Sequence, residues 1–151
     1  MINSDAERFV ANWNRIHRET SRALRAAPDD KLDWRPKDHM FTMRELIGHI
    51  AQAEEVLVRS ALAGSTQKGA FDLSNRSAND IANAFDSQHE ELAGIVSKLT
   101  ADQWRQEVEF HDRRLRRGVL LWFVTEHEIH HRGQLFTYYR LAGIEPPNLH
   151  E

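Results

Sequence analysis

Apolar residues recur three or four positions apart in four long segments of the chain, which places them on one face of a helix. We predict four helices, over residues 4–27, 42–63, 77–99 and 120–142. The stripes expected to face the core are, in chain order, Phe9-Trp13-Ile16-Thr20-Leu24, Leu46-His49-Ile50-Ala53-Leu57-Ser60, Ile81-Phe85-Gln88-Leu92-Ile95-Leu99 and Leu120-Val124-His127-His131-Leu135-Tyr138-Ala142. Two of these stripes contain histidine, which a core tolerates only when the ring finds a polar partner.

Capping residues support three of these helix starts. A Ser or Thr that accepts a hydrogen bond from the backbone three residues later, with an acidic residue there, is typical of a helix N-terminus. Gly64 is a natural stop for the second helix, and two prolines follow the fourth. The capping pairs are Ser4 with Glu7, Thr42 with Glu45, and Ser77 with Asp80.

The connections between these helices differ in length and character. Residues 27–41 are polar and irregular, with Trp34 expected to fill part of the core, and residues 64–75 are long enough to cross one end of a bundle. Residues 100–104 predict a short capped helix, and residues 107–118 a small hairpin or an irregular loop. The sequence therefore predicts an all-α four-helix bundle in a single domain, residues 1–151. The long connections permit a topology other than simple up-down.

Composition excludes several classes of function. The net charge of −3 gives no basic surface for nucleic acid, and the arginines at 113, 114, 116 and 117 follow acidic residues and are expected in a solvated turn. The absence of cysteine excludes disulfides, thiolate ligands and a cysteine nucleophile. No apolar stretch approaches the roughly 18 residues of a membrane span, and no signal-peptide pattern begins the chain. We expect a cytoplasmic protein that acts on small molecules, without a nucleic-acid or membrane partner.

The histidines on the core stripes are the main candidates for chemistry. His127 and His131 lie four positions apart, so their rings lie one helical turn apart, about 6 Å along the axis. His49 occupies a core-facing position of the second helix. Together they would form a three-nitrogen metal site with a coordination position left open for water or substrate. The alternative is a set of buried neutral histidines that bond to hydroxyls and carbonyls.

Other polar residues near these stripes have competing roles. His130 is a rival ligand to His131, although the stripe favours His131, and Gln134 or Gln52 could orient a ligand or simply satisfy a buried group. Glu45 serves the helix cap. Glu126 and Glu128 are expected to point away from the helix axis or to its edge. The remaining histidines, expected at the surface, are His17, His39, His89, His111 and His150.

The absence of certain ligands narrows the chemistry of such a site. Without cysteine or a clear carboxylate ligand, it is neither a thiolate zinc site nor a di-iron carboxylate bundle. Neutral imidazoles leave a divalent ion its full charge, which lowers the pKa of bound water or holds a thiol as thiolate. The nucleophile would then be water or a small cellular thiol. Imidazole ligands suit zinc, nickel, copper and iron alike.

Three motifs, in this order and at suitable distances, resemble the DinB-like superfamily, which includes bacillithiol transferases and mycothiol-dependent maleylpyruvate isomerases. The H-x-x-x-H-R-x-Q pattern, with an isolated histidine on the second helix, is the specific part. The motifs are LDWRP at 32–36, TMRELIGHIAQAE at 42–54, and HEIHHRGQLFTYYRLAG followed by IEPP at 127–147. The resemblance covers essentially the whole chain. It implies an up-down-down-up bundle, often homodimeric, that holds zinc or nickel through the equivalents of His49, His127 and His131.

The resemblance favours a metal-dependent thiol transferase or isomerase, with an exogenous low-molecular-weight thiol as co-substrate. Gln134, Tyr138 and Arg132 are weaker candidates for lining the cleft, and Arg132 could equally form a surface or intersubunit salt bridge. A second hypothesis is a metal-dependent hydrolase, whose general base could only be Glu45 or His130. A third is a stress-related, non-catalytic protein in which the metal joins the second and fourth helices as a structural staple.

Overall fold

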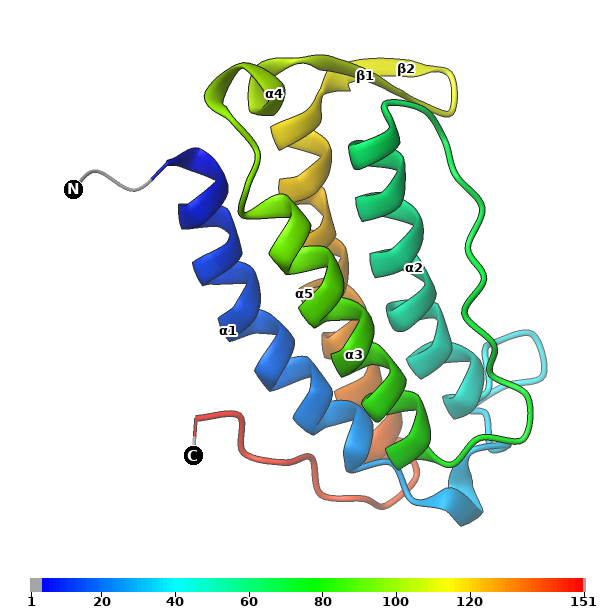
Figure 1. Ribbon diagram of the computed structural model, residues 1–151. Helices are drawn as coiled ribbons and strands as arrows, with labels where there is room; N and C mark the ends of the chain where they lie inside the picture. Colours follow the sequence, from blue (N-terminus) through cyan, green and yellow to red (C-terminus); the bar gives the residue numbers. More distant parts are fainter. Residues whose placement is uncertain (1–3, 151) are drawn as a thin grey trace.

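The computed structural model describes residues 4–150 and contains five α-helices, one short 3-10 helix and one hairpin within them. Four long helices form a bundle, as the apolar stripes predicted, and the hairpin lies across one end of it (Figure 1). The elements are α1 (Asp5–Arg25), η1 (Asp29–Lys31), α2 (Met43–Ala63), α3 (Ala78–Val96), α4 (Ala101–Arg105), β1 (Glu107–Phe110), β2 (Arg113–Arg116) and α5 (Arg117–Leu141).

The bundle has the up-down-down-up topology. α1 and α5 run in one direction, while α2 and α3 run in the other (Figure 1). α1 packs against α3 and α5, and α2 packs against the same two helices, so α1 and α2 lie diagonally opposite. Because α2 and α3 are parallel, the connection over residues 64–77 must return along the length of the bundle, and Figure 1 shows this crossover.

The predicted capping residues begin and end these helices. The side chains of Ser4 and Thr42 each accept a hydrogen bond from a backbone N–H three residues later, and the glutamates at those positions bond back. Ser77 caps α3 in the same way through its hydroxyl. Gly64 ends α2 with a φ of 82°, a left-handed conformation that favours glycine. The Thr42 cap fixes where α2 begins, and therefore the level at which the core residues of α2 lie in the bundle.

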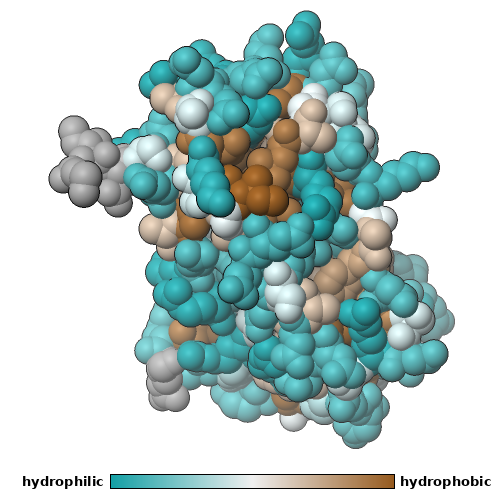
Figure 2. Space-filling view, in the orientation of Figure 1, coloured by the Kyte–Doolittle hydropathy of each residue, from teal (hydrophilic) through white to brown (hydrophobic). Residues whose placement is uncertain are grey.

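The core consists of two apolar clusters, one toward each end of the bundle. One contains Met43, Leu46 and Phe85, and the other contains Phe9 and Trp13. Figure 2 shows that the face formed by α1 and α3 is mostly hydrophilic, with one apolar patch in its upper half. Between the clusters every long helix contributes a buried polar side chain, and these residues are His17, Glu54, His89 and Glu128.

The stripe predicted for α3 is rotated relative to the real buried face. Ile95 was expected in the core but is 45% exposed, whereas its neighbour Val96 is fully buried. His89 is likewise buried, and Gln88 is only half-buried. The rotation arises because Glu54 of α2 accepts hydrogen bonds from both Gln88 and His89, which places these two polar side chains against α2.

The segment between α3 and α5 forms a short helix and a hairpin, the first of the two alternatives that the sequence left open. β1 and β2 pair antiparallel, with Val108 opposite Leu115. The arginine run is solvated as predicted at Arg113, Arg114 and Arg116, but it forms a strand rather than a turn, and Arg117 is buried. The Arg117 guanidinium donates to the Ala61 carbonyl oxygen at 2.8 Å and so ties α5 to the end of α2.

Among residues 4–150, no helix is long and apolar enough to cross a membrane.

Gly118 at the start of α5 lies against the indole of Trp104 from α4. A Cβ at position 118 would lie 2.3 Å from the Trp104 Nε1 atom, so Gly118→Ala should displace the indole. We expect it to lower the free energy of unfolding by about 1–3 kcal/mol, as overpacked core sites do. Urea denaturation followed by tryptophan fluorescence measures this change.

Gly133→Ala is the matched control in the same helix, because nothing lies within 4 Å of a Cβ placed there. It should raise the free energy of unfolding by up to about 1 kcal/mol through helix propensity alone. Equal effects of the two substitutions would contradict the contact with Trp104.

Candidate metal centre

The structure brings together the three histidines that the sequence singled out. α2 supplies His49, and α5 supplies His127 and His131 on successive turns. The Nε2 atoms of His49 and His131 are 3.1 Å apart, and one ring nitrogen from each of the three residues lies within 4.8 Å of the others. All three side chains are half-buried. The sequence predicted this meeting of side chains; that they bind a metal remains a prediction.

The geometry of this histidine centre fits a single divalent ion. Metal–imidazole bonds are about 2.0–2.1 Å long, so two ligating nitrogens on one ion lie about 3–3.4 Å apart. The observed 3.1 Å separation falls in this range. The His131 ring makes angles of 86° with the His49 ring and 60° with the His127 ring. Rings tilted in this way can direct their in-plane lone pairs to one point.

The electrostatics of the centre lower the pKa values of two of its imidazoles. Burial, followed by the nearby charges of His131, His49 and His130, lowers the pKa of His127 to about 4. Burial and the proximity of His131 also lower the pKa of His49. Metals bind the unprotonated ring nitrogen, so these two rings are ready to bind an ion at neutral pH without first losing a proton.

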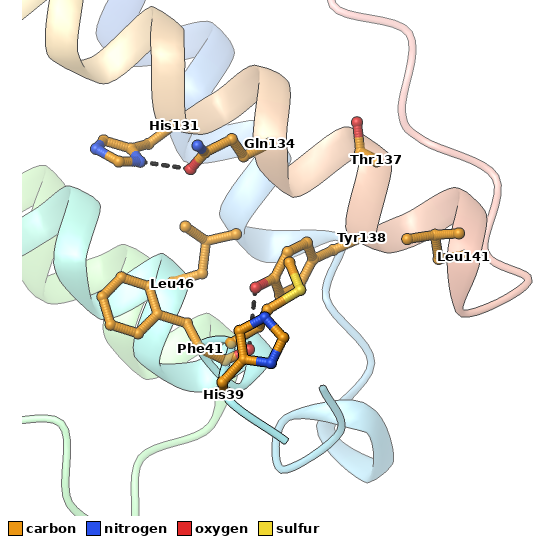
Figure 3. Close-up of a pocket in the computed structure, with 9 residues that line it drawn as sticks. His39, Phe41, Leu46, His131, Gln134, Thr137, Tyr138 and Leu141 are labelled. Atoms are coloured by element: carbon orange, nitrogen blue, oxygen red, sulfur yellow. Dashed lines mark hydrogen bonds between the residues drawn. The ribbon is translucent and has the colours of Figure 1, made fainter. Parts of the chain in front are cut away.

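Gln134 sets the proton position on His131. The Gln134 Oε1 atom accepts a hydrogen bond from the His131 Nδ1–H at 2.7 Å (Figure 3), so the neutral ring presents an unprotonated Nε2 to the centre. The Gln134 amide nitrogen lies 3.3 Å from the His130 Nε2 atom and donates to it. His130 thus contacts the amide from outside the centre, and His131, its rival, takes the inner position.

Two cavities open on opposite sides of the three histidines. One, of about 440 Å³, has His131, Gln134, Leu46 and Tyr138 in its wall (Figure 3). The other, of about 480 Å³, is lined by His49 and His127 together with apolar residues of α2, α5 and the hairpin. We call these the Gln134 cavity and the His127 cavity. A group bound at the centre is therefore accessible to small molecules from both sides.

The weaker candidates from the sequence differ in their positions. Gln134 and Tyr138 line the Gln134 cavity, where the Tyr138 hydroxyl donates to the Phe41 carbonyl oxygen at 3.0 Å. Arg132 instead lies against α1, where its guanidinium is 3.1 Å from the Glu19 carboxylate. It therefore forms the salt bridge that the sequence left open as its second role, within this chain. Glu45 remains in the helix cap, 2.6 Å from the backbone nitrogen of Thr42.

A second polar cluster lies inside the bundle, and sequence reasoning missed it. His17 and His89 were expected at the surface, but they are only 5% and 7% exposed. Both Nδ1 atoms face the same Glu54 oxygen, at 3.4 and 3.2 Å. The missed signal is Glu54 itself, an acidic residue in line with the apolar face of α2, which required buried polar partners on the facing helices.

This second cluster offers the right atoms for a metal but the wrong ring geometry. The His17 and His89 rings are stacked, with centroids 3.8 Å apart and planes 13° apart. Their in-plane lone pairs are therefore nearly parallel, and one ion cannot lie in both ring planes. His17 also lies between two carboxylates, because its Nε2 atom is hydrogen-bonded to Asp86 at 2.9 Å while its Nδ1 atom is 3.4 Å from Glu54. Although burial lowers the pKa of His17, the charge of Glu54 and the bond to Asp86 raise it overall. The cluster is a hydrogen-bonded ion network rather than a metal site.

Glu128 completes this polar layer from α5, in contrast to the prediction that it points away from the axis. It is 3% exposed, and neither carboxyl oxygen has a hydrogen-bond partner among residues 4–150. Burial, reinforced by the negative charge of Glu54, raises its pKa to about 8. Glu54 differs because, although burial raises its pKa, the bond with His89 and the proximity of His17 lower it overall. One carboxyl group of this layer is thus neutral at pH 7 and the other is ionised.

Comparison with known proteins gives consistent matches over most of the chain. The sequence profile of the DinB family matches residues 1–151. YrdA of Bacillus subtilis (strain 168) is 25% identical over 150 residues, which cover 95% of this chain and 87% of YrdA. YjoA of the same organism is 25% identical over 119 residues, 76% of this chain and 75% of YjoA.

Two crystal structures share this fold. The DinB-like protein YjoA of B. subtilis superposes with a TM-score of 0.75 at 23% identity, over 94% of this chain and 96% of YjoA. A DinB-like protein of Bacillus cereus ATCC 10987 has a TM-score of 0.79 at 22% identity, over 93% and 94% of the two chains. At these identities the structural match establishes the fold alone.

The raised pKa of Glu128 predicts a pH-dependent stability. Its folded-state pKa of about 8 lies above the ordinary value of 4.5, so the folded chain binds more protons than the unfolded chain between these two values. The free energy of unfolding should therefore fall as pH rises through this window, by up to about 1.4 kcal/mol per pH unit for one proton. Urea denaturation at several pH values from 5 to 8 measures the slope.

Glu128→Gln should reduce this slope, because the amide does not titrate. Glu126→Gln, at an exposed position of the same helix, is the matched control and should leave the slope unchanged. Identical slopes in the wild type and in Glu128→Gln would show that Glu128 is not neutral in the fold.

Proposed function

The chain belongs to the DinB family, and from this premise we propose that it is a divalent-metal-dependent enzyme. It uses an exogenous low-molecular-weight thiol for transfer or isomerisation reactions. His49, His127 and His131 are the proposed ligands, and zinc or nickel is the proposed metal. The observation that carries the proposal is the arrangement of three converging imidazoles, two of them with lowered pKa values, between two open cavities.

A divalent ion bound by three neutral imidazoles supplies positive charge that favours the thiolate form of a thiol at neutral pH. In the proposed transfer, the thiol loses its S–H proton to solvent and its sulfur forms a bond to an electrophilic carbon. The bond from that carbon to its leaving group breaks, and the leaving group takes the electron pair. In the isomerase variant, addition of the thiol is followed by its elimination, and the thiol is regenerated.

The side chains around the centre have separate tasks in this proposal. Gln134 holds His131 in the tautomer whose Nε2 atom faces the centre. The Tyr138 hydroxyl donates to the Phe41 carbonyl oxygen and thereby fixes one wall of the Gln134 cavity. The half-buried setting of the histidines excludes part of the surrounding water, which strengthens electrostatic interactions at the centre.

Two observations favour this function over its alternatives. A hydrolase requires a general base, but Glu45 is held in a helix cap, and the exposed His130 has its Nε2 atom bonded to the Gln134 amide. Within residues 4–150 no carboxylate joins the three histidines in their cluster. A structural staple would close its coordination sphere with a fourth protein ligand. The cluster has three such residues among those described, and cavities border it on two sides.

Metal content tests the proposed ligands directly. We expect about one zinc or nickel ion per chain, by mass spectrometry of untagged protein reconstituted with either metal. His127→Ala and His131→Ala should each lose the ion because two histidines hold it too weakly. His130→Ala is the matched control, since this exposed neighbour lies outside the cluster, and it should keep the ion. A wild-type chain that stays metal-free after reconstitution would overturn the proposal.

The hydrogen bond from His131 to Gln134 predicts an effect on metal affinity. Gln134→Leu removes the acceptor that fixes the His131 tautomer, so the dissociation constant for zinc should rise by about 10- to 100-fold. Competition with a chromophoric chelator measures this change. Thr137→Val alters another polar side chain of the same cavity and should leave the affinity unchanged. Equal affinities of the wild type and Gln134→Leu would contradict the positioning role.

A further inference from the structure

The His127 cavity does not end at the histidine centre. It shares Phe110, His111 and Phe123 with a further cavity of about 660 Å³ that extends along α5 under the hairpin. The two spaces therefore border one another, and His127 lies at the inner end. Each has the size of a typical small-molecule site.

The walls of this extended space are largely apolar, although water could reach them. Val119, Trp122 and Phe123 on α5 are 56%, 41% and 44% exposed, and all three line the larger cavity. Leu115 of β2 faces the same space. Exposed apolar side chains of this size, gathered in one concave place, are typical of a surface that binds an apolar partner.

The hairpin is held in position over α5, so the space exists before any ligand arrives. The Glu109 backbone nitrogen donates to the Gly64 carbonyl oxygen at 2.9 Å, and the His111 nitrogen donates to the Thr66 hydroxyl at 2.6 Å. These bonds join the last part of β1 and the turn that follows it to the start of the crossover after α2. A preformed site avoids the entropy cost of ordering its own walls when it binds.

The charged residues of the space bear on the kind of ligand. Asp112, Arg113 and Glu126 line the larger cavity together with the apolar groups, so charges of both signs are present. Neither an anion nor a cation is favoured by this mixture. A neutral apolar body is the ligand chemistry that matches the walls.

We propose that this extended space, the apolar cleft, binds an aromatic or branched apolar part of the substrate and directs its reactive end to the histidine centre. The cleft comprises the residues that line the His127 cavity and the larger cavity beside it. The proposal rests on the proposed function, because it assigns the cleft to a substrate of that same centre. It makes the enzyme selective for substrates with an apolar body and gives Phe123 the role of a specificity-determining residue.

The position of Phe123 supports this role. Its ring centroid is 6.0 Å from that of His127, in an edge-on arrangement, and it lies in the wall of both cavities. An apolar group that contacts Phe123 is therefore close to the centre at one end and to the hairpin at the other. Removal of this ring should weaken the binding of apolar bodies without removing a proposed metal ligand.

Two thiols that differ in their apolar part test the cleft on cobalt-loaded protein. Phenylmethanethiol should bind at least about tenfold more tightly than 2-mercaptoethanol, since burial of a phenyl ring contributes more than 1.4 kcal/mol. The thiolate-to-cobalt absorption band measures both dissociation constants. Phe123→Ala should lose most of this advantage and retain its cobalt.

Ile129→Ala is the matched control for this titration. Ile129 has the same 44% exposure on the same helix, but it lies outside the walls of the cleft. It should preserve the advantage of the aromatic thiol. The proposal for the apolar cleft would be overturned if both variants lost the tighter binding of phenylmethanethiol, or if the wild type did not have it. In either case, an intact absorption band with 2-mercaptoethanol would leave the proposed function standing.

A second measurement needs no metal. Amide chemical shifts of the protein as purified, titrated with phenylmethanol, should change at residues 107–126, around the cleft. Changes confined to residues 134–141, around the Gln134 cavity, would overturn the assignment. A second copy of this chain is the competing occupant, and a dimer in sedimentation experiments that Phe123→Ala dissociates would also overturn it.

Discussion

The buried carboxylate of Glu54 is the constraint on which the bundle depends. An ionised carboxylate inside a protein needs partners, and each of its oxygens has them: His17, Gln88 and His89 all lie within 3.4 Å. These partners come from α1 and α3, so one side chain of α2 fixes the level of three helices. A slip of α2 by one helical turn, about 5.4 Å, would leave this charge without compensation in an apolar core. His49 lies in the same helix as Glu54, and the histidine centre therefore depends on the same register of α2.

The two histidine clusters show how one type of side chain, the imidazole, takes opposite roles in one bundle. At the histidine centre, burial and the neighbouring histidines lower the pKa of His127, and the rings tilt toward a common point. In the cluster around Glu54, carboxylates raise the pKa of His17, and the His17 and His89 rings stack in parallel. The first arrangement offers unprotonated nitrogens to an ion, while the second holds protons. Sequence spacing alone does not separate them, because the deciding quantities are ring orientation and the sign of the nearest charge.

The sequence was sufficient for the helices, their caps and the inward-facing positions of the three histidines, because each depends on local rules. A 3.6-residue period assigned His49, His127 and His131 to core-facing stripes, and Ser or Thr caps marked the helix starts. The inner polar layer could not be predicted in the same way. His17, His89 and Glu128 appear as polar residues on helices, and only the partner that each meets across the bundle determines its burial. The exposed position of Ile95 follows from the same layer, because the bonds to Glu54 rotate α3. The sequence pattern does not contain the information about which side chains meet between helices that are far apart in the chain.

The pairing of α2 with α5, the last helix, has a consequence for how the chain folds during synthesis. His49 and His131 touch across a separation of 82 residues, and α5, the last helix of the described chain, supplies two of the three imidazoles. During synthesis the N-terminal ligand leaves the ribosome long before its partners do. The centre cannot assemble from any single helical hairpin, so a nascent chain has only one of the three nitrogens until almost all of these residues have emerged. Assembly of the histidine centre is then a late event that follows the folding of the bundle rather than one that guides it.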